Sequence, residues 1–462
     1  MAKRTKLLTL LGVLAAVCLA AFLVSRHETK VEQIKNSGEE VLSLSEDSVT
    51  GLTWTVNDAT LAFHKGDAGW QYDEDVAFPV NEAKIGELLE DFSPLTAAFQ
   101  IENVDDYGQY GLDSPVCTIT LETETQSYTI KLGDYSQMDS QRYITVNDGD
   151  VYLVEKDPLD DFDLTIRDMI QNDDTPYIDT ATEITFSGIE NARITYQEDG
   201  GSLLSEDVYY LDGKPLDSDN IRSFLDSISG LELEDYVTYQ AAEDLSQWGM
   251  DEPELTAVIR YTDRENAEQT FTLHLSRNRE ALESERQKED GDISSVAAYA
   301  RVGDSQIIYQ IRYSSFEALE KVSYNDLRHK DLFAADFADA REITVTLDGE
   351  SNTLTYQEPD DDSAAGTWYL GENEVDITEL NTQLNALAAT EFLTENPTGK
   401  QELSLKIRFE SGETRTITIY RRDAESCLAE VDGTVVDLTA RKDAVNLIEA
   451  INGIVLKEQS NA

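Results

Sequence analysis

The stretch EITFSGIENARITYQE, residues 183–198, decides the fold because the chain carries a close copy of it, EITVTLDGESNTLTYQE, at residues 342–358. Both copies begin with Glu-Ile-Thr and end with Thr-Tyr-Gln-Glu, and the second has one inserted residue. Internal repetition is sought before a fold is assigned, because each repeat corresponds to one structural unit. The sequence therefore predicts the same two strands built twice.

A short amphipathic pattern follows such strands at three places. The three segments are GWQYDEDVAFPVNEAKIGELLEDF, VYYLDGKPLDSDNIRSFLDSI and TWYLGENEVDITELNTQLNAL, and each gives aromatic residues, a turn and then a helical pattern. Apolar residues at i, i+3, i+4 and i+7 predict one-faced helices. They are Ile85, Leu88, Leu89 and Phe92 in the first segment, and Ile221, Phe224, Leu225 and Ile228 in the second. The third keeps Leu380, Leu384 and Leu387.

Further strands follow each helix. Alternating apolar residues, such as Tyr128, Ile130 and Leu132, predict hairpins with one buried face. A last strand pair closes each copy around Asp148-Gly149, Gly303-Asp304 or Asp432-Gly433, dipeptides that suit tight turns with φ > 0. The predicted order is strands, helix, strands, in triplicate.

A six-residue phrase lies between helix and hairpin in two of the copies. It reads YGLDSP at residues 110–115 and WGMDEP at residues 248–253, and the third copy has only ENPTGKQ. Glycine permits φ > 0, aspartate can accept hydrogen bonds from backbone amides two residues on, and proline fixes φ where a strand begins. We expect the aromatic residue to seal one end of the core. The predicted turn residues, interpreted as architectural rather than catalytic, are Tyr110, Gly111, Asp113, Pro115, Trp248, Gly249, Asp251 and Pro253.

The N-terminal segment differs from the rest of the chain. Lys3, Arg4 and Lys6 precede a run from Leu7 to Val24 without a charge, which would span about 27 Å as a helix. With the positive-inside bias, this predicts a single-pass anchor with a cytoplasmic N-terminus and an extracytoplasmic remainder. Two alternatives stay open: a cleaved signal peptide, and a lipoprotein acylated at Cys18.

Charge and cysteine content exclude several classes of protein. The chain has 92 acidic and 36 basic residues, a formal net charge of −56, which repels nucleic acid. Beyond the N-terminal segment only Cys117 and Cys427 remain, so no disulfide framework is predicted and both are interpreted as small buried hydrophobes.

Motifs of known chemistry are missing from the sequence. No Walker loop, nucleophile elbow or zinc cluster occurs, so we expect no enzyme activity, no catalytic residue, no cofactor and no specific metal site. The acidic loops NDGD, 147–150, and PDDD, 359–362, suggest at most weak Ca²⁺ binding. The densest basic spot, LRHKD around His329, is interpreted as a linker whose cations pair with nearby carboxylates; a binding site is the alternative.

Taken together, these motifs resemble the DUF4340 family of bacterial proteins, whose function is not established. The resemblance rests on the Trp-containing strand, the helix, YGLDSP, the hairpin, Leu132-Gly133-Asp134 and the VYLV of residues 151–154. It covers residues 50–170 best, is weaker over 180–335 and fades in the third copy. Such proteins are commonly anchored by one N-terminal helix and often encoded beside ABC-type exporters of the gliding-motility class. The resemblance implies an accessory role in transport and supplies no catalytic residues.

The sequence thus predicts an α+β fold: one N-terminal transmembrane helix followed by three tandem repeats, each an antiparallel β-sheet with one amphipathic helix. The expected parts are the cytoplasmic tip and anchor, 1–30; a stalk, 31–48; and repeats at 49–178, 179–338 and 339–462. The expected function is that of a non-enzymatic, membrane-anchored extracytoplasmic accessory or scaffold protein of an ABC-type export system, with a multi-pass permease as partner. A cell-envelope module that binds glycan or peptide is the alternative.

Overall fold

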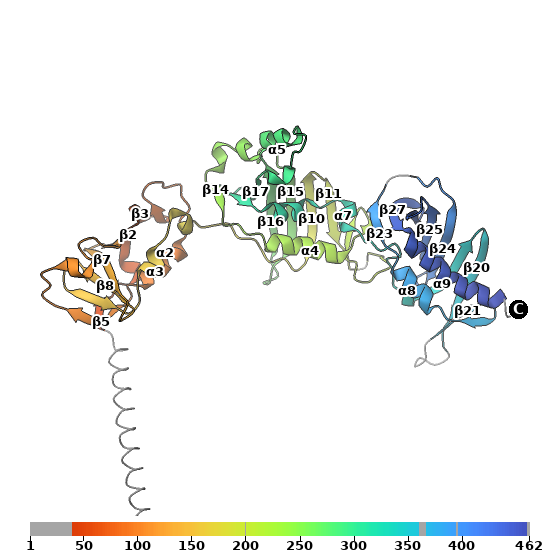
Figure 1. Ribbon diagram of the computed structural model, residues 1–462, viewed down its shortest axis with the longest axis horizontal. Helices are drawn as coiled ribbons and strands as arrows, with labels where there is room; N and C mark the ends of the chain where they lie inside the picture. Colours follow the sequence, from red (N-terminus) through yellow and green to blue (C-terminus); the bar gives the residue numbers. More distant parts are fainter. Residues whose placement is uncertain (1–38, 199, 360–365, 394–395, 460–462) are drawn as a thin grey trace, which may run out of the picture. The chain divides into compact units, whose positions relative to one another are not determined.

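A computed structural model describes residues 39–459 except 199, 360–365 and 394–395 (Figure 1). The chain divides into two compact units, residues 1–173 and 174–462. Unit 1 contains one nine-stranded antiparallel sheet and unit 2 contains two. We call them the first, second and third sheets.

The first sheet has the strand order β1-β5-β9-β8-β7-β6-β2-β3-β4. Its strands are β1 (Glu39–Leu42), β2 (Val49–Val56), β3 (Ala59–Gly66), β4 (Gly69–Tyr72), β5 (Leu95–Ile101), β6 (Cys117–Thr123), β7 (Ser127–Ser136), β8 (Gln141–Val146) and β9 (Val151–Val154). Unit 1 also contains the helices α2 (Glu82–Glu90) and α3 (Leu159–Phe162), and the 3₁₀ helices η1 (Glu46–Ser48), η2 (Tyr107–Tyr110) and η3 (Ile166–Met169).

The second sheet has the order β13-β12-β11-β10-β15-β16-β17-β18-β14. Its strands are β10 (Ala181–Gly188), β11 (Ala192–Tyr196), β12 (Tyr209–Leu211), β13 (Lys214–Pro215), β14 (Tyr236–Thr238), β15 (Leu255–Thr262), β16 (Glu268–Arg277), β17 (Ala298–Val302) and β18 (Ile308–Ile311). The helices are α4 (Ser218–Ser229), α5 (Arg279–Arg286), α6 (Tyr313–Glu320) and α7 (Tyr324–Leu327), with η4 (Ala241–Glu243), η5 (Ser246–Trp248), η6 (Ile293–Ser295) and η7 (Phe337–Asp339).

The third sheet has the order β22-β21-β20-β19-β24-β25-β26-β27-β23. Its strands are β19 (Ala340–Leu347), β20 (Glu350–Gln357), β21 (Thr367–Leu370), β22 (Asn373–Val375), β23 (Ala389–Phe392), β24 (Gln401–Phe409), β25 (Thr414–Arg421), β26 (Ser426–Val431) and β27 (Thr434–Ala440), with helices α8 (Thr378–Asn385) and α9 (Arg441–Gln459). Apart from the edge strands β1, β13 and β22, all three sheets follow one strand order.

The repeated stretch forms the same hairpin in both sheets of unit 2. Ile184 pairs with Ile194 between β10 and β11, and Ile343 pairs with Leu354 between β19 and β20. All four side chains are buried, because directly opposed residues of an antiparallel pair share one face of the sheet. The repetition in the sequence is therefore a repeated packing unit.

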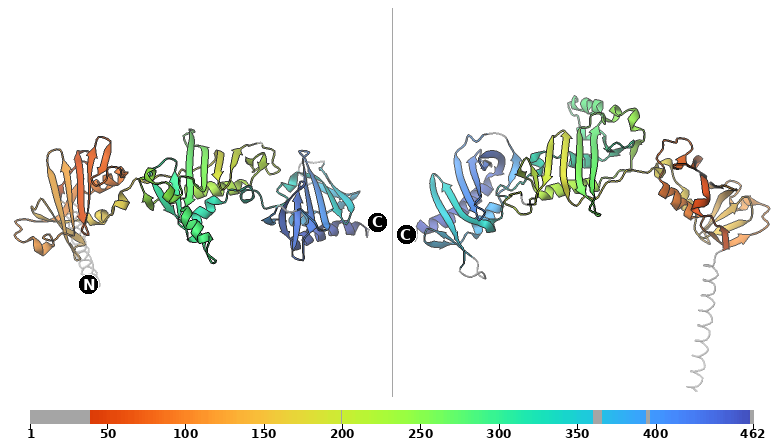
Figure 2. Two further views of the ribbon diagram at one scale, coloured as in Figure 1. Left: turned by 90° about the horizontal axis from the view of Figure 1, so that it is seen from above. Right: turned by 180° about the vertical axis from the view of Figure 1, so that it is seen from behind.

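Helices of different length cover one face of the first and third sheets. In unit 1 the buried side of α2 carries Ile85, Leu88 and Leu89, and Asn81 caps the helix by accepting a hydrogen bond from the Lys84 amide. Against the third sheet, Figure 2 shows the dark blue helix α9, whose Ala444, Leu447, Ile451 and Ile454 join the core beneath the strands. Their spacing follows the helical period, so α9 buries one stripe.

The predicted fold class is wrong. The described residues form a mostly β protein of three nine-stranded sheets, rather than a membrane helix followed by small α+β repeats with one helix each. Unit 2 alone contains α4 to α9. Edge strands such as β13 and β14 were missed because segments of two or three residues are too short to show alternation. Residues 39–48, predicted as stalk, contribute β1 and η1, and β1 pairs with β5.

The predicted localisation is also corrected. Among the described residues, none of the helices combines the length and the apolar character needed to cross a membrane. That finding overturns the prediction of a single-pass membrane protein with a cytoplasmic N-terminus. The predicted anchor, Leu7–Val24, lies outside the described residues.

The two glycine phrases form left-handed turns that press against a neighbouring strand. Gly111 ends η2 with φ +72° and Gly249 ends η5 with φ +74°. A Cβ atom at Gly111 would lie 2.8 Å from the backbone nitrogen of Asp134 on β7, and one at Gly249 would lie 2.5 Å from the carbonyl oxygen of Arg277 on β16. In return, a Cβ at Gly133 would lie 2.2 Å from the carbonyl oxygen of Tyr110. The phrase and the Leu-Gly-Asp motif are thus two sides of one close backbone contact.

The other residues of the phrase surround this contact. Tyr110 packs on Tyr143 and Trp248 on Tyr299, each pair with ring centroids 5.0 Å apart. Pro115 and Pro253 are half-buried just before β6 and β15. Asp113 is exposed, and Asp251 pairs with Arg279 at 3.1 Å between Oδ1 and Nη2.

Replacement of Gly249 by alanine should destabilise unit 2 more than the same change at Gly349. Both residues have positive φ, but only Gly249 has backbone within contact of an added Cβ; Gly349 has open space. We expect Gly349→Ala to cost about 1 kcal/mol from backbone strain. Gly249→Ala should cost about 3 kcal/mol or more, since the turn must also move away from β16. Denaturant unfolding followed by circular dichroism measures both, and equal costs would contradict a rigid contact.

Candidate functional site

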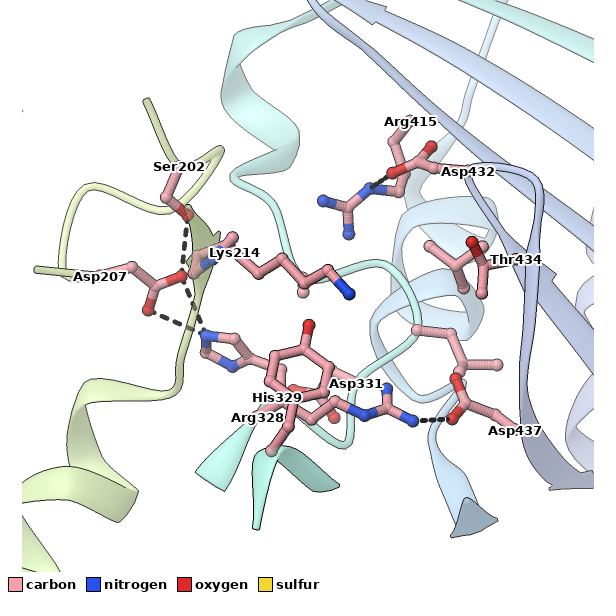
Figure 3. A pocket seen from close by; sticks show the side chains of 15 residues that line it. Ser202, Asp207, Lys214, Arg328, His329, Asp331, Arg415, Asp432, Thr434 and Asp437 are labelled. Atoms are coloured by element: carbon pink, nitrogen blue, oxygen red, sulfur yellow. Dashed lines mark hydrogen bonds and ion pairs between the residues drawn. The ribbon is translucent and has the colours of Figure 1, made fainter. Parts of the chain in front are cut away.

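A polar cavity lies within unit 2, between the second and third sheets, and we call it the junction pocket (Figure 3). Its volume is about 290 Å³. The lining combines acidic, basic and aromatic side chains: Ser202, Asp207, Lys214, Pro215, Tyr324, Arg328, His329, Asp331, Leu332, Ala334, Arg415, Val431, Asp432, Thr434 and Asp437.

The segment that follows α7 positions the centre of the pocket. Ser323 and Asp326 form a capping box that starts α7, and this single turn ends at Leu327, so that Arg328 and His329 come next. The backbone then pairs with the third repeat: the Leu332 amide donates to the Leu387 carbonyl at 3.0 Å, and Lys330 accepts from the Ala389 amide at 2.7 Å. The basic residues of LRHKD are therefore held on a fixed backbone.

Arg328 is buried against a carboxylate and an aromatic ring. Its Nη2 donates to Oδ1 of Asp437 at 2.6 Å, and its guanidinium lies 3.7 Å from the centroid of the Phe392 ring. Burial raises the pKa of Asp437, although the hydrogen bond and charge of Arg328 act in the opposite direction. Removing either partner would leave a buried charge without compensation, so the pair must persist as a pair.

His329 joins the linker to the second sheet. Its Nε2 lies 2.9 Å from Oδ1 and 3.0 Å from Oδ2 of Asp207, whose carboxylate also accepts from the Ser202 hydroxyl at 2.8 Å. Burial lowers the pKa of His329, but the hydrogen bond and charge of Asp207, with the charges of Asp217 and Asp331, outweigh it and hold the pKa above its ordinary value. The pairing with carboxylates that the sequence predicted for this segment is present.

Arg415 and Lys214 complete the cationic side of the pocket. Nη1 of Arg415 donates to the Phe333 carbonyl at 2.8 Å, and its Nε lies 3.1 Å from Oδ2 of Asp432. Asp432 is placed by the β26–β27 turn, where it and Gly433 both have positive φ. The ammonium of Lys214 lies 5.1 Å from the centroid of the Tyr324 ring, a cation–π contact.

A second concavity lies on the first sheet, and we call it the unit 1 groove. Its volume is about 540 Å³, and it is lined by Ala98, Phe99, Ile101, Asp139, Gln141, Tyr143, Leu153 and Glu155. Phe99 and Tyr143 both oppose Leu153, so the three side chains form a row across β5, β9 and β8. The Phe99 side chain is 60% exposed and Met138, in the adjacent β7–β8 turn, is 91% exposed.

A β-bulge creates this row. Ala97 opposes Val154 and Phe99 opposes Leu153, so β5 advances two residues while β9 advances one. A bulge of this kind reverses which face the following residues occupy. Ala97 is consequently buried and Phe99 faces outward. The sequence reasoning missed the groove because the run Leu95, Ala97, Phe99 alternates as a single buried face.

The side chains that could bind a metal ion or react as thiols are the histidines, cysteines and carboxylates in the parts of the chain that the structure describes. There, no three His, Cys, Asp or Glu side chains are grouped so that they could hold a metal ion. In the NDGD loop, Asp148 pairs with Lys131 at 2.6 Å, while PDDD lies outside the described residues from position 360 on. Cys117 and Cys427 are free and buried, and burial raises the pKa of their thiols to about 12 and about 11.

Fold and sites together define a protein of repeated antiparallel sheets with a charged junction and one exposed apolar groove. Residues 70–204 and 210–407 match the model of a family described as "Domain of unknown function (DUF4340)". The chain belongs to this family, and the match extends into the third repeat, where the sequence motifs fade. No curated protein and no solved structure matches the chain.

The contribution of His329 to stability should decrease as pH rises. A group whose folded pKa lies above its unfolded value stabilises fully below the unfolded pKa, and this stabilisation is lost as pH rises through the folded pKa. The thermal midpoint of the parent protein should therefore exceed that of His329→Gln by more at about pH 6 than at about pH 9. Each unit by which folding raises the pKa of His329 corresponds to about 1.4 kcal/mol of stability.

Asp207→Asn provides the matched background, because it removes the carboxylate that holds the His329 proton. In that background the pH dependence of the His329→Gln effect should shrink, as a double-mutant cycle would show. A midpoint difference that stays constant with pH in the parent background would contradict the assignment.

Proposed function

We propose that this protein is a non-enzymatic accessory or scaffold protein that acts by binding a protein partner through the unit 1 groove. The observation that carries the proposal is the pair of exposed side chains Phe99 and Met138, with the half-buried Tyr143 and the buried Leu153 forming the floor between them. Large apolar side chains that form a contiguous exposed patch mark contact sites more often than chance. Aromatic residues and methionine are enriched where proteins meet.

The charges around the groove favour a particular kind of partner. Asp139 and Glu155 line it and are exposed, and the chain as a whole carries −56. A partner segment with apolar side chains and flanking lysine or arginine residues would complement both the row and its acidic rim. The family resemblance points to an ABC-type export system, and the permease subunit of such a system is the partner we propose.

The tryptophans bear on the alternative, a glycan-binding or peptide-binding module. Trp54, Trp70 and Trp368 are buried beneath the sheets, and Trp248 is half-buried against Tyr299. A glycan module would be expected to present such rings in an open groove, where their faces can stack on sugar. Burial of these side chains therefore counts against a glycan site built on the tryptophans.

Crosslinking in intact cells, followed by quantitative mass spectrometry, tests the proposal. The unmodified chain should capture a permease subunit of an ABC-type exporter. Phe99→Glu should reduce that capture by about thirtyfold, since placing a charge in the centre of an apolar contact typically costs about 2 kcal/mol or more. Phe99 is exposed, so the change should leave folding largely intact.

Val76→Glu is the matched control. Val76 is 70% exposed and follows β4, at the opposite end of the sheet from β5. Its replacement by glutamate introduces the same charge as Phe99→Glu. Capture of the permease should survive this change. Equal loss in both variants would argue against the groove, and recovery of wall glycan or of no permease would argue against the proposed function.

A further inference from the structure

The junction pocket is lined by four basic side chains and four carboxylates, but not every basic group has all of its N–H donors matched by an acceptor. Arg328 is paired with Asp437 and His329 with Asp207, each at hydrogen-bond distance. Arg415 lies 3.1 Å from Asp432, whereas Lys214 has no carboxylate within ion-pair distance among the described residues. Both side chains line the same cavity and extend into it in Figure 3.

Arg415 is buried without a full set of acceptors. Its side chain is 14% exposed, and a guanidinium has five N–H donors. One of them donates to the Phe333 carbonyl, whereas Nε, although 3.1 Å from Asp432, makes no hydrogen bond among the described residues. Burial lowers the pKa of Arg415, which reflects the cost of keeping this charge away from water. An acceptor that entered the pocket would relieve that cost.

Lys214 supplies the second charge. Its ammonium rests over the Tyr324 ring, and across the described residues no carboxylate lies within ion-pair distance of it. Lys214 is exposed on the two-residue edge strand β13, so it can reach a ligand without refolding the sheet. A planar guanidinium fork and a mobile ammonium form a common arrangement for carboxylate and phosphate oxygens.

We propose that the junction pocket is a binding site for a small oxyanion, a carboxylate or a phosphate, held between Lys214 and Arg415. Its volume of about 290 Å³ suits a small molecule. Asp437 favours a ligand that also carries a hydrogen-bond donor. Its side chain is 1% exposed, and its Oδ2 has no hydrogen-bond partner among the described residues. An oxyanion that also carries a hydroxyl or amino group would satisfy both the cations and this acceptor. The site lies in unit 2 and does not depend on the partner proposed for unit 1.

Titration calorimetry of the full chain tests the site with three probes at constant ionic strength: sodium glycolate, inorganic phosphate and ethanolamine hydrochloride. At least one of the two oxyanions should bind saturably with one-to-one stoichiometry, and ethanolamine should not bind. Glycolate alone would identify a carboxylate site, and phosphate alone a phosphoryl site. Binding of both would leave the shared oxyanion chemistry as the assignment.

Lys214→Gln should raise the Kd of the oxyanion about tenfold or more, as expected for the loss of one charge-assisted contact. Arg415→Lys, which keeps the charge but removes the fork, should also weaken it. Lys406→Gln, an exposed lysine on β24 outside the pocket, should bind like the parent chain. Absence of saturable binding by both oxyanions would overturn the proposal. So would binding that Lys214→Gln leaves unchanged, because Lys214 is exposed and its loss should not unfold the chain.

Discussion

An antiparallel sheet has two faces, and hydrophobic burial can be completed only on a face that other elements cover. The rest of this structure follows from that constraint. On β24, Leu403, Leu405 and Ile407 are buried under the helices while Lys406 and Arg408 face outward. The acidic surface is the counterpart. The net charge of −56 is tolerated because, among the described residues, the only buried acidic side chains are those of Asp91, Asp207 and Asp437.

The exceptions are few buried arginines, and each is tied to a carboxylate. Nε of Arg142 donates to both oxygens of Asp157, at 2.7 and 2.8 Å, and Nη2 of Arg277 donates to Glu254 at 2.6 Å. Desolvation makes a lone buried cation costly, so a fixed partner is required wherever one occurs. Arg415 follows the same pattern through Asp432, 3.1 Å from its Nε, although this Nε makes no hydrogen bond among the described residues.

Two kinds of local irregularity interrupt the regular sheets: left-handed turns and a β-bulge. The left-handed turns at Gly111 and Gly249 let a loop approach a strand to backbone contact, and they act on packing. The bulge at Ala98 acts on the surface, because it turns Phe99 from the core to the outside. Regular alternation alone would have produced a closed core on one face and a polar surface on the other. The groove exists because alternation is broken at one position.

Local sequence determined the hairpins, the amphipathic helices α2 and α4 and the two glycine turns, because periodicity and left-handed φ are properties of a few consecutive residues. It could also have revealed α9, whose buried residues follow the helical period. Only the tertiary structure decided the two candidate sites. His329 meets Asp207 across 122 positions and Arg328 meets Asp437 across 109, separations over which no local pattern operates. The outward orientation of the Phe99 side chain depends on how β5 pairs with β9. A bulge shifts the register between two strands, and register is a property of the pair rather than of either strand.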